Sequence, residues 1–237
     1  MVKFVLANFK SYTLDLLPYL EHLKKNLPQE LVPFVTLFPP LSTLGACKSA
    51  GVQVGAQNAY PALEGAFTGE ITLHALQELG IHSILIGHSE RRLLGEEPRF
   101  CLEKFAFFKE QGFQIVFCIG EPLATRDLGQ EAVLDRLLKQ LEGLDLSYPK
   151  LIVAYEPIWA IGTGVSAQTS DIASTIGGLK ACLKPRVKIV YGGSVQASNA
   201  DSILSLPEVD GVLIGKACLD LQALLDIINI SHTKELA

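Results

Sequence analysis

Short apolar segments rich in β-branched residues recur along the whole chain, and we expect each of them to form a β-strand. Their hydrophobicity is nearly continuous instead of alternating, which is typical of strands that are buried on both faces, as in parallel sheets. The expected strands cover residues 2–7, 33–38, 52–56, 83–86, 113–119, 151–155, 187–191 and 211–214. The pattern therefore predicts eight buried strands.

Apolar residues at spacings of three and four lie between these segments and predict helices. One series is Leu14, Leu17, Leu20, Leu23 and Leu27, and another is Val133, Leu134, Leu137, Leu138 and Leu141. Ser42, Thr72, Ser170 and Ser198 stand where helices should begin and are candidate N-caps. Gly51, Gly80 and Gly112 follow three candidate helices, as C-terminal caps do. The chain thus reads as strand and helix in strict alternation.

Eight strand–helix units without a linker between them predict one domain, residues 1–237, with the α/β fold of a closed (β/α)8 TIM barrel. The eight parallel strands would be surrounded by the helices. An open, doubly wound sheet is the alternative, but it usually carries a glycine fingerprint after the first strand. Here that place holds Asn8-Phe9-Lys10. In a barrel, chemistry is expected on the loops that follow the strands.

Composition narrows the class of protein. Hydrophobic residues make up 49% and charged residues 19% of the chain, which predicts a packed globule. A net charge of −5 argues against nucleic acid as a partner, and an anion site would need local positive charge. Five scattered cysteines without a CxxC pair predict free thiols and no metal site. Neither a signal peptide nor a membrane-spanning run is recognisable, so we expect a cytoplasmic protein without membrane contact.

Polar groups follow the first and fourth expected strands. Asn8 and Lys10 come after the first, where a lysine on its own is most often a solvated charge. His88 follows the fourth, within Gly87-His88-Ser89-Glu90-Arg91-Arg92. A histidine at a helix N-terminus is expected to have a lowered pKa, so that it acts as a neutral hydrogen-bond donor. In the alternative interpretation Ser89 caps the helix and His88 is only a packing residue.

The segment after the sixth strand is the most informative. Glu156 directly follows a buried strand, and Pro157, apolar residues with the only Trp, and two glycines come after it. Such a segment is typical of a lid that closes over a ligand, and exclusion of water would adjust the carboxylate for work as a base. The alternative is an ordinary loop carboxylate beside an apolar plug.

Glycines follow the seventh and eighth strands, in Gly192-Gly193-Ser194 and Gly215-Lys216-Ala217. Glycine lets backbone N–H groups approach an anion closely, and these two loops of a barrel commonly form a phosphate site. Neither loop has the spacing of a P-loop. Ordinary tight turns are the alternative for each loop, but two glycine loops at matching positions favour phosphate.

Taken together, these segments resemble the triosephosphate isomerase family over nearly the whole chain. The most specific are Ile86-Gly87-His88-Ser89-Glu90-Arg91-Arg92 and the stretch from Tyr155-Glu156-Pro157 to Gly162-Thr163-Gly164. Others are Asn8-Phe9-Lys10, Gly55-Ala56-Gln57-Asn58, Gly65-Ala66-Phe67-Thr68-Gly69-Glu70, Cys118-Ile119-Gly120-Glu121 and Tyr191-Gly192-Gly193-Ser194-Val195. The resemblance implies interconversion of D-glyceraldehyde 3-phosphate and dihydroxyacetone phosphate in glycolysis and gluconeogenesis, without a cofactor.

The resemblance also implies roles for residues. Glu156 would be the base, His88 the electrophile that shuttles protons, and Lys10 the fixed positive charge. Asn8 and Glu90 would belong to the polar surroundings, and Thr68 would insert into a partner subunit of a homodimer. The phosphate would be held by backbone amides of Gly162, Ser194, Gly215 and Lys216. Lys216 stands where the family usually has a glycine.

Two other functions are compatible with a phosphate-binding barrel. A sugar-phosphate epimerase would typically need a metal or a second carboxylate, and no ligand cluster is recognisable in the sequence. A non-catalytic protein on the same scaffold would have lost one of the three key residues, whereas Glu156, His88 and Lys10 are all present. The isomerase is therefore the preferred prediction.

Overall fold

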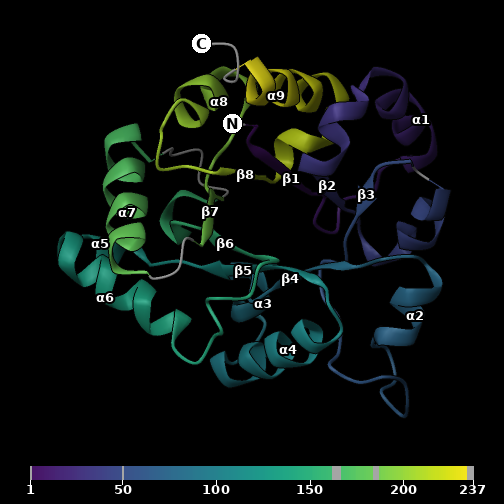
Figure 1. Cartoon of the computed structure of the whole chain (residues 1–237), viewed down its shortest axis with the longest axis horizontal. Helices are drawn as coiled ribbons and strands as arrows, with labels where there is room; N and C mark the ends of the chain where they lie inside the picture. The colour runs from purple at the N-terminus through teal and green to yellow at the C-terminus, as the bar shows by residue number, and fades with distance from the viewer. Residues whose placement is uncertain (1, 50, 162–166, 184–186, 234–237) are drawn as a thin grey trace.

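The computed structural model describes residues 2–49, 51–161, 167–183 and 187–233, and in these residues it contains eight parallel strands (Figure 1). They are β1 (Phe4–Asn8), β2 (Val35–Phe38), β3 (Gln53–Val54), β4 (Ser83–Ile86), β5 (Gln114–Ile119), β6 (Leu151–Tyr155), β7 (Lys188–Tyr191) and β8 (Gly211–Ile214). Each lies within one predicted segment, apart from Asn8 at the end of β1. The prediction of an eight-stranded barrel is confirmed.

The strands pair in the order β3-β2-β1-β8-β7-β6-β5-β4. The register brings Val5 opposite Val35 and Val212, so the first strand joins the second and the last. Between β3 and β4 the pairing is a single parallel bridge, Ala56 to Ile84. The barrel is therefore nearly closed, and its weakest seam lies between β3 and β4.

Helices surround the strands (Figure 1). They are α1 (Leu16–Asn26), α2 (Leu73–Glu78), α3 (Ser89–Leu93), α4 (Pro98–Glu110), α5 (Leu123–Arg126), α6 (Gln130–Leu141), α7 (Thr169–Cys182), α8 (Ala197–Leu204) and α9 (Leu221–Thr233). Short 3₁₀ helices are η1 (Gln29–Phe34), η2 (Leu41–Ser49), η3 (Ile158–Ala160) and η4 (Lys216–Leu219). Between β2 and β3 the expected α-helix is replaced by η2, so the alternation is less strict than predicted.

The predicted helix ends are correct at the glycines and mostly wrong at the serines. Gly51, Gly80 and Gly112 have φ of 68°, 71° and 72°, the left-handed conformation of a C-terminal cap. Ser170 and Ser198 lie one residue inside α7 and α8, and the caps are Gln168 and Gln196. Thr72 holds the N-cap position of α2, but its side chain makes no capping hydrogen bond. Ser42 lies within η2.

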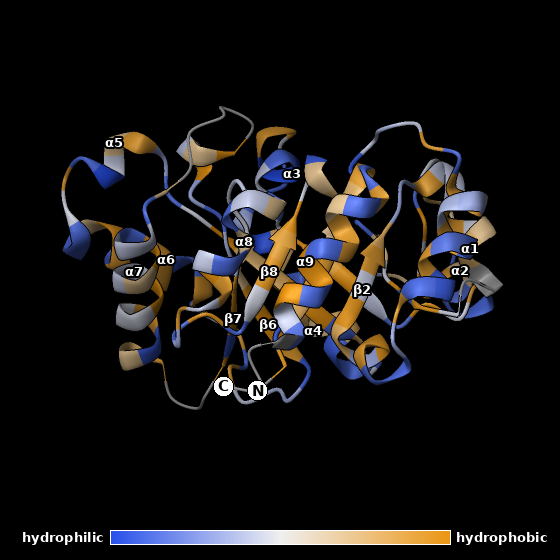
Figure 2. Cartoon of the chain, turned by 90° about the horizontal axis from the view of Figure 1, so that it is seen from above, coloured by the Kyte–Doolittle hydropathy of each residue, from blue (hydrophilic) through white to orange (hydrophobic). Residues whose placement is uncertain are grey.

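Apolar side chains form two layers, one inside the barrel and one between strands and helices. Leu6, Phe38, Leu85, Val116 and Leu213 belong to the inner cluster. The outer cluster contains alternate strand residues and the inward faces of the helices, and polar residues gather on the outer surface (Figure 2). Of the predicted free thiols, Cys47, Cys101, Cys118 and Cys218 are buried and Cys182 is exposed. Within the described residues no helix is long and apolar enough to cross a membrane.

Candidate active site

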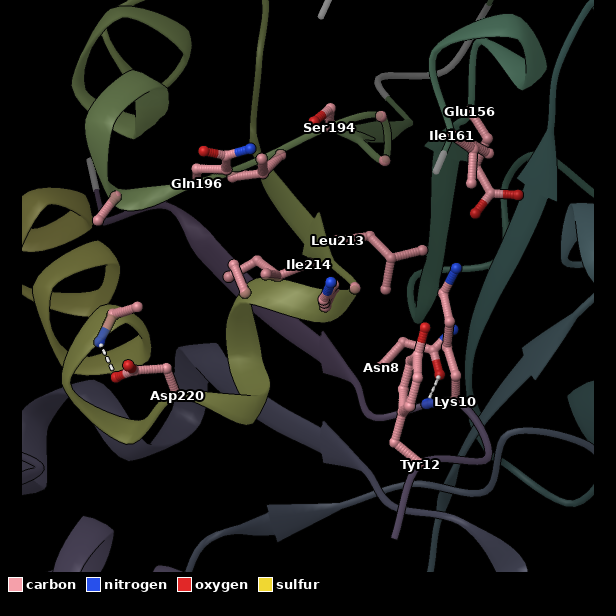
Figure 3. Close-up of a pocket in the computed structure, with 18 of the residues that line it drawn as sticks. Asn8, Lys10, Tyr12, Glu156, Ile161, Ser194, Gln196, Leu213, Ile214 and Asp220 are labelled. Atoms are coloured by element: carbon pink, nitrogen blue, oxygen red, sulfur yellow. Dashed lines mark hydrogen bonds between the residues drawn. The ribbon is translucent and has the colours of Figure 1, made fainter. Parts of the chain in front are cut away.

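A cavity of about 850 Å³ lies at the carboxyl ends of the strands, where a barrel is expected to carry its chemistry. Its lining comes from the ends of β1, β4, β6, β7 and β8 and the loops that follow them. Lys10 and Glu156 extend toward this hollow from opposite sides, with Ser194 on a third side (Figure 3). Side chains far apart in sequence therefore meet in one place.

Most of the predicted site residues line this cavity. They are Asn8, Lys10, His88, Glu156, Ser194, Gly215 and Lys216. Glu90 lies beside it and pairs with Lys10, at 2.5 Å between carboxylate and ammonium. Thr68 is exposed and does not line it. Gly162 lies outside the residues that the structure describes, as do Thr163 and Gly164 at the end of the predicted lid.

The carboxylate of Glu156, the residue that directly follows β6, is buried against the first residue of α3. Its side chain is 2% exposed, and one carboxylate oxygen, Oε2, accepts a hydrogen bond of 3.0 Å from the backbone N–H of Ser89. The other, Oε1, lies 3.1 Å from His88 Nε2. A Cβ on Gly192 would stand 2.9 Å from Glu156 Cγ, so only glycine leaves room for this carboxylate. The acid is thus held between two donors at the cavity wall.

His88, and not Ser89, is the N-cap residue of α3. Its Nδ1 accepts a hydrogen bond of 3.3 Å from the backbone N–H of Glu90, so Nδ1 carries no proton and Nε2 is the donor atom that faces Glu156. Burial lowers the pKa of His88, but the charge and hydrogen bond of Glu156 outweigh burial and raise it above its ordinary value. The lowered pKa that the sequence predicted for His88 is wrong, because nothing in the sequence indicated that Glu156 would lie beside Nε2.

Lys10 is held in an unusual backbone conformation. Its φ is 53°, and no other non-glycine residue described has a positive φ. Asn8 Oδ1 accepts from the Lys10 N–H at 3.0 Å, and the side-chain amide of Gln57 donates to the Lys10 carbonyl at 2.7 Å. Strain of this kind persists where surrounding contacts fix it, most often at functional sites. Gln57 therefore positions Lys10. In the sequence Gln57 is recognisable only as part of a family motif, with no role assigned to it.

A buried ion pair supports the backbone in front of His88. Lys104 and Glu96 have side chains that are each 1% exposed, and Lys104 Nζ lies 2.7 Å from a Glu96 oxygen. Glu96 also accepts a hydrogen bond of 3.2 Å from the N–H of Gly87, the residue before His88. Burial would raise the pKa of Glu96, but Lys104 keeps that pKa below its ordinary value. Sequence reasoning missed this pair, because charged residues give no sign that they are buried.

Replacing Lys104 by Met should lower the free energy of unfolding by about 3–5 kcal/mol, because it leaves the Glu96 carboxylate buried without its main partner. Urea unfolding at pH 7 measures the loss. Since the pKa of Glu96 is lowered by folding, the stabilisation is present above about 4.5, its unfolded value, and disappears as pH falls through the folded pKa. Lys139→Met, at an exposed pair on α6, is the control and should leave the free energy of unfolding nearly unchanged. A loss for Lys104→Met as small as that of the control would contradict this reading of the pair.

The segment after Glu156 is anchored to a buried acid. Trp159 Nε1 donates to Glu121 Oε1 at 3.0 Å, and the Tyr155 hydroxyl donates to the same oxygen at 3.1 Å. Burial raises the pKa of Glu121, and these two hydrogen bonds only partly offset the rise. Ile161, the last residue described before the gap, lines the cavity. The segment predicted to be apolar therefore contributes the Ile161 side chain to the cavity wall.

The loops after β7 and β8 contain glycines at positions where a side chain would crowd neighbouring residues. A Cβ on Gly193 would stand 2.2 Å from the Tyr191 hydroxyl, and one on Gly215 would stand 3.2 Å from Lys10 Cε. The backbone of both loops can therefore come close to the cavity and to Lys10. Lys216 is exposed at the rim and adds a second cation to the lining. Within the described chain no group of three or more His, Cys, Asp or Glu is arranged to hold a metal ion.

Comparison with known proteins places this site in context. The family model described as triosephosphate isomerase matches residues 3–231. The chain is 51% identical to "Triosephosphate isomerase" of Helicobacter pylori (strain Shi470) over 232 residues, which cover 97% of this chain and 99% of the relative. It is 54% identical to the protein of the same name from Wolinella succinogenes over 197 residues, 82% of this chain and 84% of the relative. A similar protein from Sulfurovum sp. (strain NBC37-1) is 53% identical over 196 residues.

Proposed function

The chain belongs to the triosephosphate isomerase family, and we propose that Glu156, His88 and Lys10 carry its reaction. The enzyme is an intramolecular aldose–ketose isomerase that interconverts D-glyceraldehyde 3-phosphate and dihydroxyacetone phosphate. The observation that supports the assignment is the meeting of a carboxylate, an imidazole and an ammonium around one cavity of about 850 Å³.

In the proposed reaction Glu156 removes the proton from C2 of glyceraldehyde 3-phosphate and returns a proton to C1. The electron pair of the broken C–H bond forms the C1–C2 double bond of an enediolate, and the negative charge develops on the former carbonyl oxygen. The Nε2–H of His88 donates to that oxygen and moves protons between the two oxygens. Lys10 stabilises the charge electrostatically, which is effective because the ammonium is already in position.

The position of the carboxylate sets the direction of the pKa shift of His88 in this scheme. While Glu156 lies 3.1 Å from Nε2, it raises the pKa of His88 above its ordinary value. When the carboxylate turns to the substrate carbon, that effect is lost, and the Glu90 N–H at Nδ1 then favours the neutral ring. A neutral imidazole is the form that donates to a carbonyl oxygen without carrying a fixed charge.

We further propose that backbone amides of Ser194, Gly215 and Lys216 hold the phosphate, together with Gly162, which lies outside the described residues. A side chain at position 193 would clash with Tyr191, and one at position 215 would crowd Lys10, so glycine at both positions supports close approach of an anion. The chain carries a net charge of −5, so the cations Lys10 and Lys216 must supply the positive potential locally.

Replacing Lys216 by Gly should raise KM for glyceraldehyde 3-phosphate only a few-fold, with kcat nearly unchanged. The backbone amide that binds phosphate survives the change, and an exposed ammonium contributes about 1 kcal/mol at most. Initial rates over a range of substrate concentrations separate kcat from KM. A loss in kcat/KM beyond about tenfold, roughly 1.4 kcal/mol, would show that the side chain has a larger part in binding.

The enzyme is also proposed to be a cytoplasmic homodimer whose protomer is one domain, residues 1–237. A second cavity of about 350 Å³ shares Asn8, Lys10 and His88 with the first, and Leu41 and Leu94 line it although they are 57% and 78% exposed. Such exposure of apolar side chains is typical of an interface. The exposed Thr68 loop of a partner would fill this cavity.

Leu94→Glu should yield monomers in sedimentation equilibrium, whereas a monomeric unchanged protein would contradict the proposal.

Metal dependence distinguishes the isomerase from an epimerase on the same barrel. Protein treated with a chelator should convert glyceraldehyde 3-phosphate to dihydroxyacetone phosphate at the untreated rate, measured in a coupled assay. Activity that disappears with the chelator and returns with a divalent cation would favour the epimerase type of site.

A further inference from the structure

A cleft of about 440 Å³ lies at the opposite end of the barrel from the catalytic cavity. Its lining includes Gln53, Ser83 and Gln114, the first residues of β3, β4 and β5, and Lys150, which directly precedes β6. Because all strands run in the same direction, their first residues lie at the end away from Glu156 and His88. The proposed reaction uses none of the residues around this cleft.

The floor of the cleft is a polar layer within the barrel. The register places Ser83 opposite Gln114, and Thr36 opposite Gln53. Alternation along the strands puts Ser83 and Gln114 on the face that carries Leu85 and Val116 inside the barrel. The Ser83 hydroxyl is buried and has no hydrogen-bond partner among the described residues. An unsatisfied hydroxyl of this kind costs free energy unless something supplies a partner.

The cleft opens at the weakest seam of the barrel. The strands β3 and β4 are joined only by the bridge from Ala56 to Ile84, which lies beyond β3 toward the catalytic end. At their beginnings Gln53 and Ser83 are therefore not joined by strand pairing. A molecule seated here would contact both sides of this seam, so its binding would stabilise the folded barrel.

The lining combines positive charge with apolar surface. Lys150 lines the cleft with its ammonium, and no Asp or Glu is among the lining residues described. Lys150 Nζ donates one hydrogen bond, of 2.7 Å, to the Gly112 carbonyl, and an ammonium has two further hydrogens to offer. Apolar contacts are available from Leu44, Cys47, Val54, Leu79 and Ile81. An anionic head with an aliphatic chain matches this surface.

We propose that the cleft binds a short aliphatic monocarboxylate. Its carboxylate would accept hydrogen bonds from Lys150 and the Gln114 amide, and its chain would lie against Leu44, Leu79 and Ile81. A carboxylate near the layer would also give the Ser83 hydroxyl an acceptor. The volume falls within the range of about 300–1,000 Å³ that is usual for small-molecule sites.

Hexanoate is the probe, and isothermal titration calorimetry with a thermal melt is the measurement. We expect saturable binding at one site per chain, a rise in Tm with hexanoate concentration, and no competition from inorganic phosphate. Lys150→Met should weaken binding about fivefold, the upper end for an exposed ion pair, and Lys150→Arg should restore part of the loss. Lys139→Met, with the same change in net charge on α6, should bind as the unchanged protein does.

Other outcomes overturn the proposal. They are an absence of saturable binding, equal affinity in Lys150→Met and the unchanged protein, and equal affinity for hexanol, which lacks the charge. Competition by inorganic phosphate would place hexanoate in the catalytic cavity instead. Each variant should keep isomerase activity, because Lys150 lies outside the catalytic cavity, and this shows that it has folded. The result is independent of the roles proposed for Glu156, His88 and Lys10.

Discussion

Exchange of Glu156 for Gln is expected to lower kcat by about 10³- to 10⁴-fold, the upper range for removal of a general base. The amide has nearly the shape of the carboxylate but cannot accept the proton from the substrate carbon. Its NH₂ group would also face one of two N–H donors, Ser89 or His88, that now hold the carboxylate oxygens. Single-turnover and steady-state rates with glyceraldehyde 3-phosphate measure the loss.

Glu156→Asp separates position from basicity. The carboxylate is retained but withdrawn by about one C–C bond, and a displacement of about 1 Å can cost about 10²-fold in rate. We expect kcat to fall by about that factor with little change in KM or in the urea midpoint. Unchanged kcat in either Glu156 variant would show that this residue is not the base. A fall in kcat that is matched by a fall in the free energy of unfolding would show that its role is structural.

Replacing Lys10 by Met should lower kcat/KM by about 10²- to 10³-fold, the loss seen when one preorganised electrostatic group is removed. Met keeps most of the aliphatic chain, so the backbone N–H of residue 10 should still donate to Asn8 and its carbonyl should still accept from Gln57. Lys10→Arg tests position, because it keeps the charge but places it on a longer, planar group.

A role as solvated charge predicts something different for Lys10. In that case Lys10→Met would change kcat/KM by less than about fivefold, as for an exposed ion pair. Gln57→Leu gives a second test, since it removes the donor to the Lys10 carbonyl and leaves the ammonium in place. It should lower kcat to a smaller extent than Lys10→Met, and an undiminished kcat would show that Gln57 does not position Lys10.

The fold was predictable because the signal is local and repeated. A strand buried on both faces reads as a continuous apolar run wherever it occurs, and eight such runs in alternation with helical spacing leave few alternatives. The positions of Asn8, Lys10, His88 and Glu156 followed from the same pattern, since a barrel brings strand ends to one mouth. Their meeting around one cavity is what the structure adds.

The misses in the site have a common cause, which is dependence on partners remote in sequence. The pKa of His88 is raised and not lowered, because the carboxylate of Glu156, which follows another strand, lies 3.1 Å from Nε2. Lys104 and Glu96 look like ordinary surface charges until α4 packs them inside the molecule. The cap predicted at Ser198 was wrong for a more local reason. Gln196 is the N-cap of α8, and its N–H donates to the Asn199 side chain at 2.8 Å. No spacing rule gave these contacts.

Turnover of glyceraldehyde 3-phosphate in D₂O tests the central claim most directly, because a carboxylate that carries the proton between carbons can exchange it with solvent. With chelator-treated protein, the account predicts dihydroxyacetone phosphate with deuterium on the former aldehyde carbon, detected by NMR, and loss of both turnover and labelling in Glu156→Gln. Turnover and labelling that persist at the unchanged rate in Glu156→Gln would contradict proton transfer by Glu156.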